Sequence, residues 1–284
     1  MNKAFVIAIF VSHVLTACNY IDPENESTRT IAVSVVCNDE HKPQGWHFDL
    51  FDENGYFDTS YITEDQRIEI YNKYATLLIY NDTKTTKVYY TGNDINVIAT
   101  TDRLNDQAFI GRHPIVYMPD KLYSTLLETQ GNDEQTAEVK PRVFTYNIDI
   151  SLNDKDNNIK DCTEASIEGV ARAVDIISET RSDSTAAMYF RVEYNNNKHI
   201  TGHFTTFGLP SGKQQSATIR LRLLRKDNTA AYLIIDPTDD MLKHQKGTTI
   251  SRSADAQSAQ PVNPTDNNNV DIEPSHTEFI HVKI

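Results

Sequence analysis

The fold of this chain is decided by the stretch Val143-Phe144-Thr145-Tyr146-Asn147-Ile148-Asp149-Ile150-Ser151-Leu152. From Tyr146 onward apolar and polar residues alternate, and the stretch contains neither glycine nor proline. A period of two residues is the spacing of a β-strand that buries one face. We therefore expect a long strand here and further strands on both sides of it.

The second half of the chain continues in the same way. Further β-rich runs lie at 166–177, 187–194, 199–207, 217–224 and 231–235. Together with the long strand they suit a β-sandwich of about seven strands. Residues 246–269 are poor in aromatics and rich in small polar residues and proline, so we expect a mobile loop there. The alternation at 279–284 predicts a last strand that packs into the second sheet.

The first half holds shorter β-rich runs. They lie at 31–36, 46–51, 67–71, 74–80 and 87–90, with a short strand expected at 114–119 and a helical turn at 120–128. Asn54-Gly55 offers the positive φ angles of a tight reversal after the second run. A spacing of about ten residues favours a sandwich here too. We place the boundary between the two domains between residues 135 and 136.

The N-terminus has the pattern of a lipoprotein signal. Lys3 precedes an apolar run at 4–14, and Leu15-Thr16-Ala17-Cys18 closes it. The run of about 12 residues covers roughly 18 Å as a helix, short of the ~30 Å hydrocarbon core that a spanning helix must cross. We expect residues 1–17 to be removed as a signal peptide and Cys18 to carry lipid, which would hold the chain in a membrane. The alternative is an ordinary secretory signal with a chance cysteine.

Residues 18–29 are polar and acidic, with almost nothing to bury, and are expected to form a tether. The whole chain has 27 Lys and Arg against 40 Asp and Glu, a net charge of -13. This charge repels nucleic acid, so a nucleic-acid partner is excluded from our expectations. The net negative charge also favours solubility, and by itself it does not indicate a partner.

Two cysteines remain besides Cys18. Cys37 and Cys162 would lie in an oxidising compartment after export. They could form one disulfide that joins the two halves of the chain. They could equally remain buried free thiols.

The sequence contains no metal-protease helix, phosphate-binding glycine loop or nucleophile elbow. The run Asp154-Lys155-Asp156-Asn157-Asn158 resembles the start of a calcium loop, but it lacks the turn glycine and the bidentate Glu, so we favour an Asx-rich hairpin turn. His199 and His203 are too far apart on a strand to share one metal. We therefore expect no catalytic residues, no metal site and no cofactor, and hence no enzyme.

Tyrosine is abundant, with 14 residues. Five of them lie close together in sequence: Tyr71, Tyr74, Tyr80, Tyr89 and Tyr90. Flat rings with hydroxyls could form a platform on which a glycan stacks. The alternative is that they are half-buried strand residues.

Several short motifs carry a family resemblance. They are the hairpin at 46–55, Leu78-Ile79-Tyr80-Asn81-Asp82, Met118-Pro119-Asp120-Lys121-Leu122-Tyr123 and Thr206-Phe207-Gly208-Leu209-Pro210, in order after the lipid signal and tether. In this order the chain resembles fimbrillin-type lipoproteins of Bacteroidales. More narrowly, it is similar to an uncharacterised family of such lipoproteins related to the minor-fimbrium anchor subunits. The resemblance covers nearly the whole mature chain.

The resemblance implies an all-β chain with two tandem transthyretin-like β-sandwich domains, at 30–135 and 136–284. It also implies an outer-membrane lipoprotein on the cell surface that serves as a pilus anchor, accessory or tip subunit and contacts fimbrial subunits by strand addition. Related stalk subunits are trimmed by an arginine-specific protease, and Arg29 could be such a processing site. The competing hypothesis is a surface lipoprotein that binds a glycan ligand.

Overall fold

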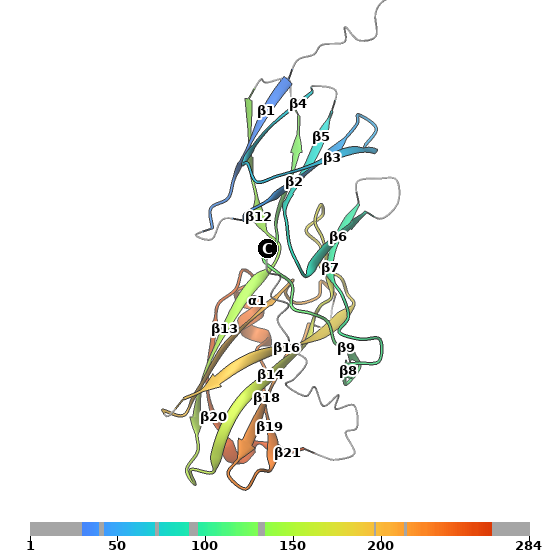
Figure 1. The fold of residues 1–284 in the computed structure, drawn as a ribbon. Helices are drawn as coiled ribbons and strands as arrows, with labels where there is room; N and C mark the ends of the chain where they lie inside the picture. Colours follow the sequence, from blue (N-terminus) through green and yellow to red (C-terminus); the bar gives the residue numbers. More distant parts are fainter. Residues whose placement is uncertain are drawn as a thin grey trace, which may run out of the picture.

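A computed structural model describes residues 30–39, 43–71, 74–90, 96–129, 134–195, 197–212 and 215–262, with the exception of the Thr163 side chain. These residues are almost entirely β-strand. One short helix, α1 (Thr238–Lys243), and one 3-10 turn (Ala256–Ser258) are the helical elements within them. Figure 1 shows an elongated molecule with two lobes placed end to end. The expected all-β fold is confirmed.

Lobe 1 is a sandwich of two sheets. One sheet has the order β11-β1-β4 and the other the order β12-β10-β5-β2-β3. Their strands are β1 (Thr30–Val36), β2 (Trp46–Phe51), β3 (Phe57–Thr63), β4 (Arg67–Tyr71), β5 (Thr76–Asn81), β10 (Tyr123–Glu128), β11 (Glu134–Glu138) and β12 (Lys140–Pro141). Trp46, Phe48 and Leu77, all fully buried, meet side chains of β1 in one core between the sheets. The sandwich therefore rests on the alternation that the sequence shows.

Strand β1 lies in the centre of its sheet. It pairs in parallel with β11 and antiparallel with β4. Ile31 and Val33 are fully buried in the core. Removing β1 would therefore expose the core and unpair two strands.

The reversal predicted after β2 is confirmed, and an aspartate organises it. Strands β2 and β3 pair antiparallel across it. The Asp52 carboxylate accepts hydrogen bonds of 2.9 Å from the backbone N–H groups of Asn54 and Tyr56. Gly55 has φ 78°, the left-handed backbone that a glycine adopts most easily.

Lobe 2 is one sheet folded over its own core. Its order is β20-β13-β17-β16-β14-β18-β19-β21. The strands are β13 (Phe144–Asn153), β14 (Ile159–Ala171), β16 (Thr185–Tyr194), β17 (His199–Thr206), β18 (Thr218–Arg225), β19 (Ala230–Ile235), β20 (Thr249–Asp255) and β21 (Gln260–Pro261). Tyr146, Ile167, Phe204 and Leu221 come from different strands and share one buried cluster. The two halves of the sheet thus face each other as the layers of a sandwich do.

Strand β16 makes the corner between these halves. Its residues from Thr185 to Arg191 pair with β14, whereas Val192 to Tyr194 pair with β17. Both neighbours run antiparallel to it. One strand therefore belongs to both layers, and the core is continuous around it.

A small third sheet joins the lobes. It has the order β15-β7-β6, with β6 (Thr86–Tyr90), β7 (Val97–Thr101) and β15 (Ala173–Asp175). A hairpin of β8 (Phe109–Ile110) and β9 (His113–Pro114) lies beside lobe 2 (Figure 1). A buried cluster runs through the junction and includes Phe51 and Leu78 of lobe 1, Val97 of β7, Val174 of β15 and Phe207 of lobe 2. The lobes are therefore packed on each other through an apolar core.

The predicted boundary at 135/136 falls within β11, which belongs to lobe 1. The chain leaves lobe 1 after β12 at Pro141 and enters lobe 2 at Phe144. The segment from β6 to β9 precedes this point, yet β7 pairs with β15 and Ile115 bridges to Ala187. The junction is thus built from segments on both sides of the boundary.

Two local predictions were wrong. Residues 120–128 do not form a helical turn, because residues 123–128 form β10 and pair with β5. Residues 249–255, expected as loop, form β20, which pairs in parallel with β13. Its Ile250 is fully buried, and most of the other side chains remain accessible. A polar edge strand is held by main-chain pairing, which leaves little hydrophobic signal in the sequence. The strand predicted at 279–284 lies outside the described residues.

Cys37 and Cys162 are both free and buried. Cys37 lies in the core of lobe 1, and Cys162 lies in the core of lobe 2. Because separate cores hold the two thiols, they do not form the disulfide considered from the sequence. The structure matches the alternative of two buried thiols.

Thiol labelling checks this separation. Burial, followed by the charges of Asp161 and Glu164, raises the pKa of the Cys162 thiol to about 12. We expect iodoacetamide at about pH 8 to leave Cys162 unmodified in the folded protein, because the thiolate is the reactive form. In protein unfolded without reductant, both Cys37 and Cys162 should be labelled. Two thiols that become labelled only after reduction would contradict the structure.

Candidate functional site

The sites expected from the sequence fall in different places. Cys18 and Arg29 lie outside the described residues, so lipidation and processing stay predictions. Within the described ranges, no group of three or more His, Cys, Asp or Glu side chains is arranged to hold a metal ion. The His199 ring lies 2.9 Å from the Asp149 carboxylate through Nδ1, on neighbouring strands. The structure thus gives this histidine a polar partner.

The run at 154–158 forms a turn that the Asp154 carboxylate organises. The Asp154 carboxylate accepts hydrogen bonds from the N–H groups of Asn158 (2.9 Å) and Ile159 (3.0 Å). Asn157 has φ 50°. The turn does not close a hairpin, because β13 pairs with β17 and β20, and β14 pairs with β16 and β18. It instead carries the chain from one half of the lobe 2 sheet to the other.

The five clustered tyrosines do not form one platform. Tyr74 is buried in the core of lobe 1, and Tyr71 is exposed on β4. Tyr89 and Tyr90 are neighbours on β6 and so point to opposite faces. Tyr80 and Tyr90 alone come together, and they meet at Asp49. The platform interpretation of these five residues is wrong, and strand packing places most of them.

Asp49 is the centre of a polar cluster on the outer face of lobe 1. It lies on β2, is 1% exposed, and accepts hydrogen bonds from the Ser60 and Tyr90 hydroxyls. The Tyr80 hydroxyl lies beside both Asp49 and Tyr90. The His47 ring stacks on Tyr80 with centroids 4.7 Å apart and planes at 8°. A buried charge is stable here because hydroxyl groups satisfy it.

Burial, followed by the adjacent Asp49 carboxylate, raises the pKa of Tyr80. Burial and the hydrogen bond to the same carboxylate raise the pKa of Tyr90. Both phenols therefore remain protonated at neutral pH, and Tyr90 acts as a donor to Asp49. The cluster holds β6 on the outer face of the β2 strand. The sequence showed Asp49 only as a polar residue between core positions, and nothing in it identified the partners.

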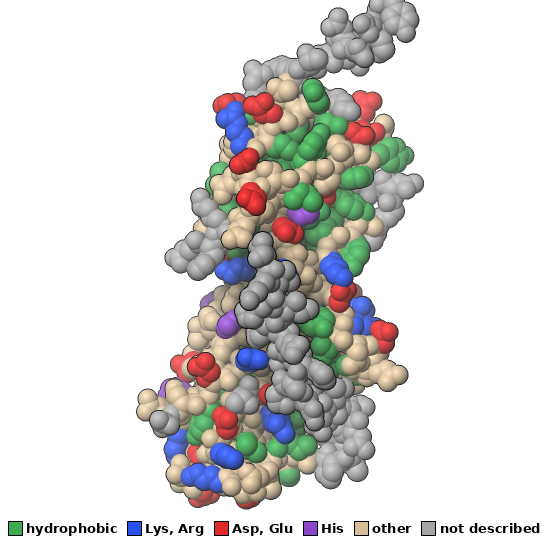
Figure 2. All heavy atoms as spheres, viewed as in Figure 1, with side chains coloured by type: hydrophobic (Ala, Val, Ile, Leu, Met, Phe, Trp, Pro, Cys, Tyr) green, Lys and Arg blue, Asp and Glu red, His purple; other side chains and the backbone are tan. Residues whose placement is uncertain are grey.

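The edge of this sheet carries an exposed apolar surface, which we call the apolar strip. It consists of Tyr56, Phe57, Tyr61 and Ile62, which are 52%, 51%, 44% and 69% exposed. The Phe57 ring packs near Tyr90, with centroids 5.5 Å apart. Figure 2 shows hydrophobic side chains gathered over this part of lobe 1. Exposed apolar surface that is contiguous is typical of an interaction site.

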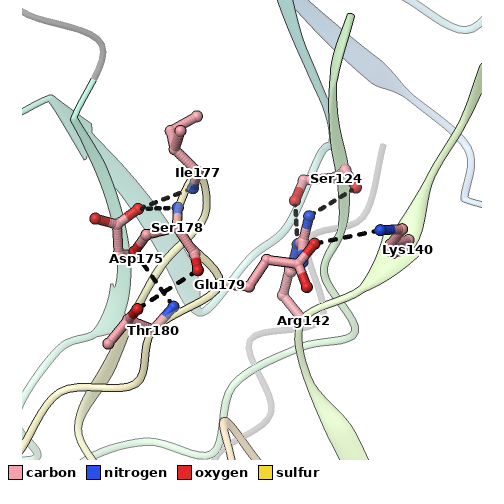
Figure 3. A network of polar contacts seen from close by, with 8 residues as sticks. All are labelled: Ser124, Lys140, Arg142, Asp175, Ile177, Ser178, Glu179 and Thr180. Carbon is pink, nitrogen blue, oxygen red and sulfur yellow. Dashed lines mark hydrogen bonds and ion pairs between the residues drawn. The ribbon is translucent and has the colours of Figure 1, made fainter.

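A second polar cluster lies at the junction of the lobes (Figure 3). Arg142 follows β12 and is 7% exposed. Its Nε donates to Ser124 Oγ at 2.6 Å, and its Nη1 lies 2.8 Å from Glu179 Oε1. Lys140 Nζ reaches the same carboxylate oxygen at 3.5 Å. Arg142 therefore connects β10 of lobe 1 with a turn that follows β15.

That turn presents Glu179 to Arg142. The Asp175 carboxylate accepts hydrogen bonds from the N–H groups of Ile177 (2.8 Å) and Ser178 (2.9 Å). Glu179 itself has φ 58°, an uncommon backbone for a residue other than glycine. The hydrogen bond from Arg142 lowers the pKa of Glu179, and the charges of Arg142 and Lys140 add to this effect. The junction is thus held by ionic contacts as well as by its apolar core.

In both polar clusters the central group already has protein partners. The oxygens of Asp49 are occupied by hydroxyl donors, and Arg142 is occupied by Ser124 and Glu179. Among the described residues, no helix is long and apolar enough to span a membrane. The residues in these clusters hold elements together, and the apolar strip lies exposed beside the cluster around Asp49.

Fold and surface together define an elongated two-lobe all-β protein. Comparison with protein-family models finds no match for this sequence, and comparison with curated proteins finds no relative. Solved structures do share the fold. A candidate adhesin from Bacteroides ovatus aligns with a TM-score of 0.59 at 15% identity, covering 86% of this chain and 92% of the other.

Two further solved structures are similar. The fimbrial anchor protein Mfa2 from Porphyromonas gingivalis has a TM-score of 0.51 at 11% identity, covering 79% of this chain and 90% of Mfa2. A candidate polysaccharide-binding protein from Bacteroides thetaiotaomicron also has a TM-score of 0.51 at 11% identity, with 78% and 89% covered. This chain shares its fold with a candidate adhesin and a fimbrial anchor protein of Bacteroidales, in agreement with the resemblance noted in the sequence.

Proposed function

We propose that this chain is a fimbria-associated lipoprotein, an anchor or accessory subunit held in the outer membrane by lipid on Cys18 and exposed at the cell surface. The fold shared with a candidate adhesin and a fimbrial anchor protein supports this proposal. So does the lipid signal at residues 15–18. A non-enzymatic role is part of this proposal.

One observation favours an anchor or accessory subunit over a polymerising stalk subunit. β1 begins at Thr30, directly after Arg29, and lies between two strands with its apolar side chains in the core. A cut at Arg29 would leave β1 in place and free no groove. The next arginine in the sequence is Arg67, in β4. An arginine-specific protease therefore has no site between them at which it would release β1 alone.

The position of the N-terminal strand in the elongated molecule suits an anchored protein. β1 starts at the end of lobe 1 that faces away from lobe 2 (Figure 1). The tether expected at residues 18–29 would reach the membrane from that end. Lobe 1 would then lie near the membrane, and lobe 2 would project outward.

A pull-down of the tagged protein from its own outer membrane tests the proposal, with Cys18→Ala as the comparison. We expect wild type to carry palmitate label, to sediment with the outer membrane and to recover a fimbrillin-like partner in near-stoichiometric amount. Cys18→Ala should lose the label and the membrane fraction, because no lipid remains to insert. Arg29→Ala is the matched control and should behave as wild type. Recovery of the lipidated protein without any fimbrial subunit would overturn the proposal.

Glycan binding is the second candidate. It is favoured by the exposed aromatic residues of the apolar strip and by the fold shared with a candidate polysaccharide-binding protein. Electrophoresis in gels that contain polysaccharide measures it directly. Saturable retardation that is lost in Phe57→Ala, together with no fimbrial partner in the pull-down, would replace the first proposal with the second.

A further inference from the structure

Strand β3 is an edge strand that combines length with exposed apolar side chains. It ends the order β12-β10-β5-β2-β3 and pairs with β2 on one side. Among the described strands, none pairs with its other side. An edge of this kind presents unpaired main-chain groups to which another strand can bind.

The other edges of the main sheets are protected. β12 and β21 are two residues long, and each contains a proline, Pro141 or Pro261. β11 and β20 are polar, and β4 carries Arg67 and Glu69. Strand β3 spans seven residues without lysine or proline. Its one charged residue, Asp58, lies at the bulge against β2, and among the described edges of the main sheets β3 has the most exposed large apolar side chains.

The apolar strip lies on both faces of β3. Ile62 is paired with His47, and Phe57 with Phe51, so these two side chains share the outer face of the sheet. Tyr61 is paired with Phe48 and so shares the core face. A strand added beside β3 would bury apolar side chains on its two faces at once. Main-chain hydrogen bonds would supply affinity, and these contacts would supply specificity.

Charge identifies the kind of partner. Residues 52–66 contain five carboxylates and neither lysine nor arginine. Asp52 and Glu53 precede β3, and Glu64 and Asp65 follow it, so both ends of the strip are acidic. A groove of about 550 Å³ lined by Ser34, Val35 and residues 65–69 opens beside the second acidic turn, and its Arg67 faces Glu134 at 3.4 Å.

A second copy of this chain fits poorly. Antiparallel pairing of two β3 strands would place the turn before β3 against the turn after it, and both are acidic. Parallel pairing would place each acidic turn against its own copy. Like charges that face each other destabilise such a contact. A basic partner gains from the same arrangement.

We propose that the edge of β3 opposite β2 binds an extended segment of another protein by strand addition, and that this segment has alternating apolar residues flanked by lysine or arginine. The proposal rests on the proposed fimbrial function and names the surface through which a fimbrial subunit is held. This surface is distinct from the β1 position, which the chain fills with its own strand.

Photo-crosslinking tests the surface. Ile62→Cys places a thiol on the strip, and Cys37 and Cys162 are buried, so a benzophenone maleimide should label position 62 selectively. The labelled full-length lipoprotein is returned to outer membranes of its own cell and irradiated. Ile234→Cys is the matched control, because Ile234 is 51% exposed on β19, which has neighbours on both sides. We expect an adduct from position 62 in an extended, basic-flanked segment of another protein, and none above the unmutated background from position 234.

The pull-down with Ile62→Glu measures the contribution of the strip. Ile62 is largely exposed, so this change leaves the fold intact, and we expect roughly tenfold less partner than with wild type or Ile62→Val. Recovery should also fall with added salt, since opposite charges steer the contact. Equal recovery of the partner with Ile62→Glu and with wild type would contradict β3 as the binding surface. It would leave the proposed fimbrial function unaffected.

The other possible crosslinking results also test the proposed partner and the proposed surface. An adduct with a second copy of this chain would overturn the choice of partner. The absence of an adduct at position 62 would contradict β3 as the binding surface. If wild type recovers no fimbrial subunit, the proposed function fails, and the crosslink still decides whether β3 binds a strand.

Discussion

Gly169→Val is expected to unfold lobe 2 or to lower its stability by roughly 2–6 kcal/mol, the sum of a strained backbone and an overpacked contact. Gly169 lies in β14 at a bulge, where the register with β16 shifts between Glu168 and Val170. Its φ is 84°, which a β-branched residue rarely adopts. A Cβ at this position would lie 2.1 Å from the carbonyl oxygen of Ser216. Because the obstacle is main chain, a side-chain movement cannot relieve it.

The two lobes can be followed separately in this experiment. Trp46 is the one tryptophan of the chain and is buried in lobe 1, so its fluorescence reports that lobe. Labelling of Cys162 reports the core of lobe 2. In Gly169→Val, Cys162 should react at a lower urea concentration than in wild type, and ahead of the change at Trp46. A large loss is expected because a whole domain is stable by only about 5–15 kcal/mol.

Gly45→Ala is the matched control. A Cβ at Gly45 would lie 3.5 Å from the Asp82 Cβ, an ordinary contact, and its backbone is outside the left-handed region. Its unfolding midpoint should stay close to that of wild type. An unchanged midpoint in Gly169→Val would show that the bulge does not need glycine.

The sequence predicted the strands that bury one regular face. In β2, Trp46, Phe48 and Leu50 alternate with His47 and Asp49, and the period of two survives folding because the sheet is buried on that face. The same holds for β13. Its alternating residues Tyr146, Ile148, Ile150 and Leu152 lie in the core of lobe 2.

Strands stabilised by main-chain pairing were missed. β20 buries Ile250 fully and otherwise has small or polar residues, so its composition is that of a loop. β11 has the sequence Glu-Gln-Thr-Ala-Glu, and its Ala137 is buried. Each pairs in parallel with the first strand of its lobe, which lies over 90 residues away in sequence for both. Such a partner is set by topology, and local patterns do not contain it.

The sequence did not predict the polar clusters, for a related reason. Asp49 and Tyr90 are separated by 41 positions, and the partners of Arg142 lie on β10 and on the turn after β15. A carboxylate or an arginine in a sequence is exposed by default, since burial of a charge is costly without partners. Only the packing of β6 and of the junction shows that these two charges are buried and satisfied.

Arg142→Ala is expected to destabilise the junction by about 2–3 kcal/mol, the magnitude of lost hydrogen bonds that involve a charged group. The guanidinium is 7% exposed and bonds both Ser124 and Glu179, so its removal leaves Ser124 without its partner and the two lobes without this link. Arg67→Ala is the control. Arg67 also faces a carboxylate, Glu134 at 3.4 Å, but both side chains are exposed, and we expect a loss below about 1 kcal/mol.

The same junction gives a dependence on pH. Glu179 is half exposed, so Glu179→Gln should cost below about 1 kcal/mol at neutral pH. The hydrogen bond from Arg142 lowers the pKa of Glu179, so the native state binds its proton more weakly than the unfolded state. The stabilising contribution of the Glu179–Arg142 ion pair is therefore present above the ordinary carboxyl pKa of about 4.3. It is lost as pH falls through the lower pKa that Glu179 has in the native state. The stability difference between wild type and Glu179→Gln should shrink below about pH 4, and in an Arg142→Ala background it should fall at every pH to the smaller part that Lys140 supplies. A difference that persists unchanged in acid, or without Arg142, would mean that Glu179 acts through its backbone turn and not through this ion pair.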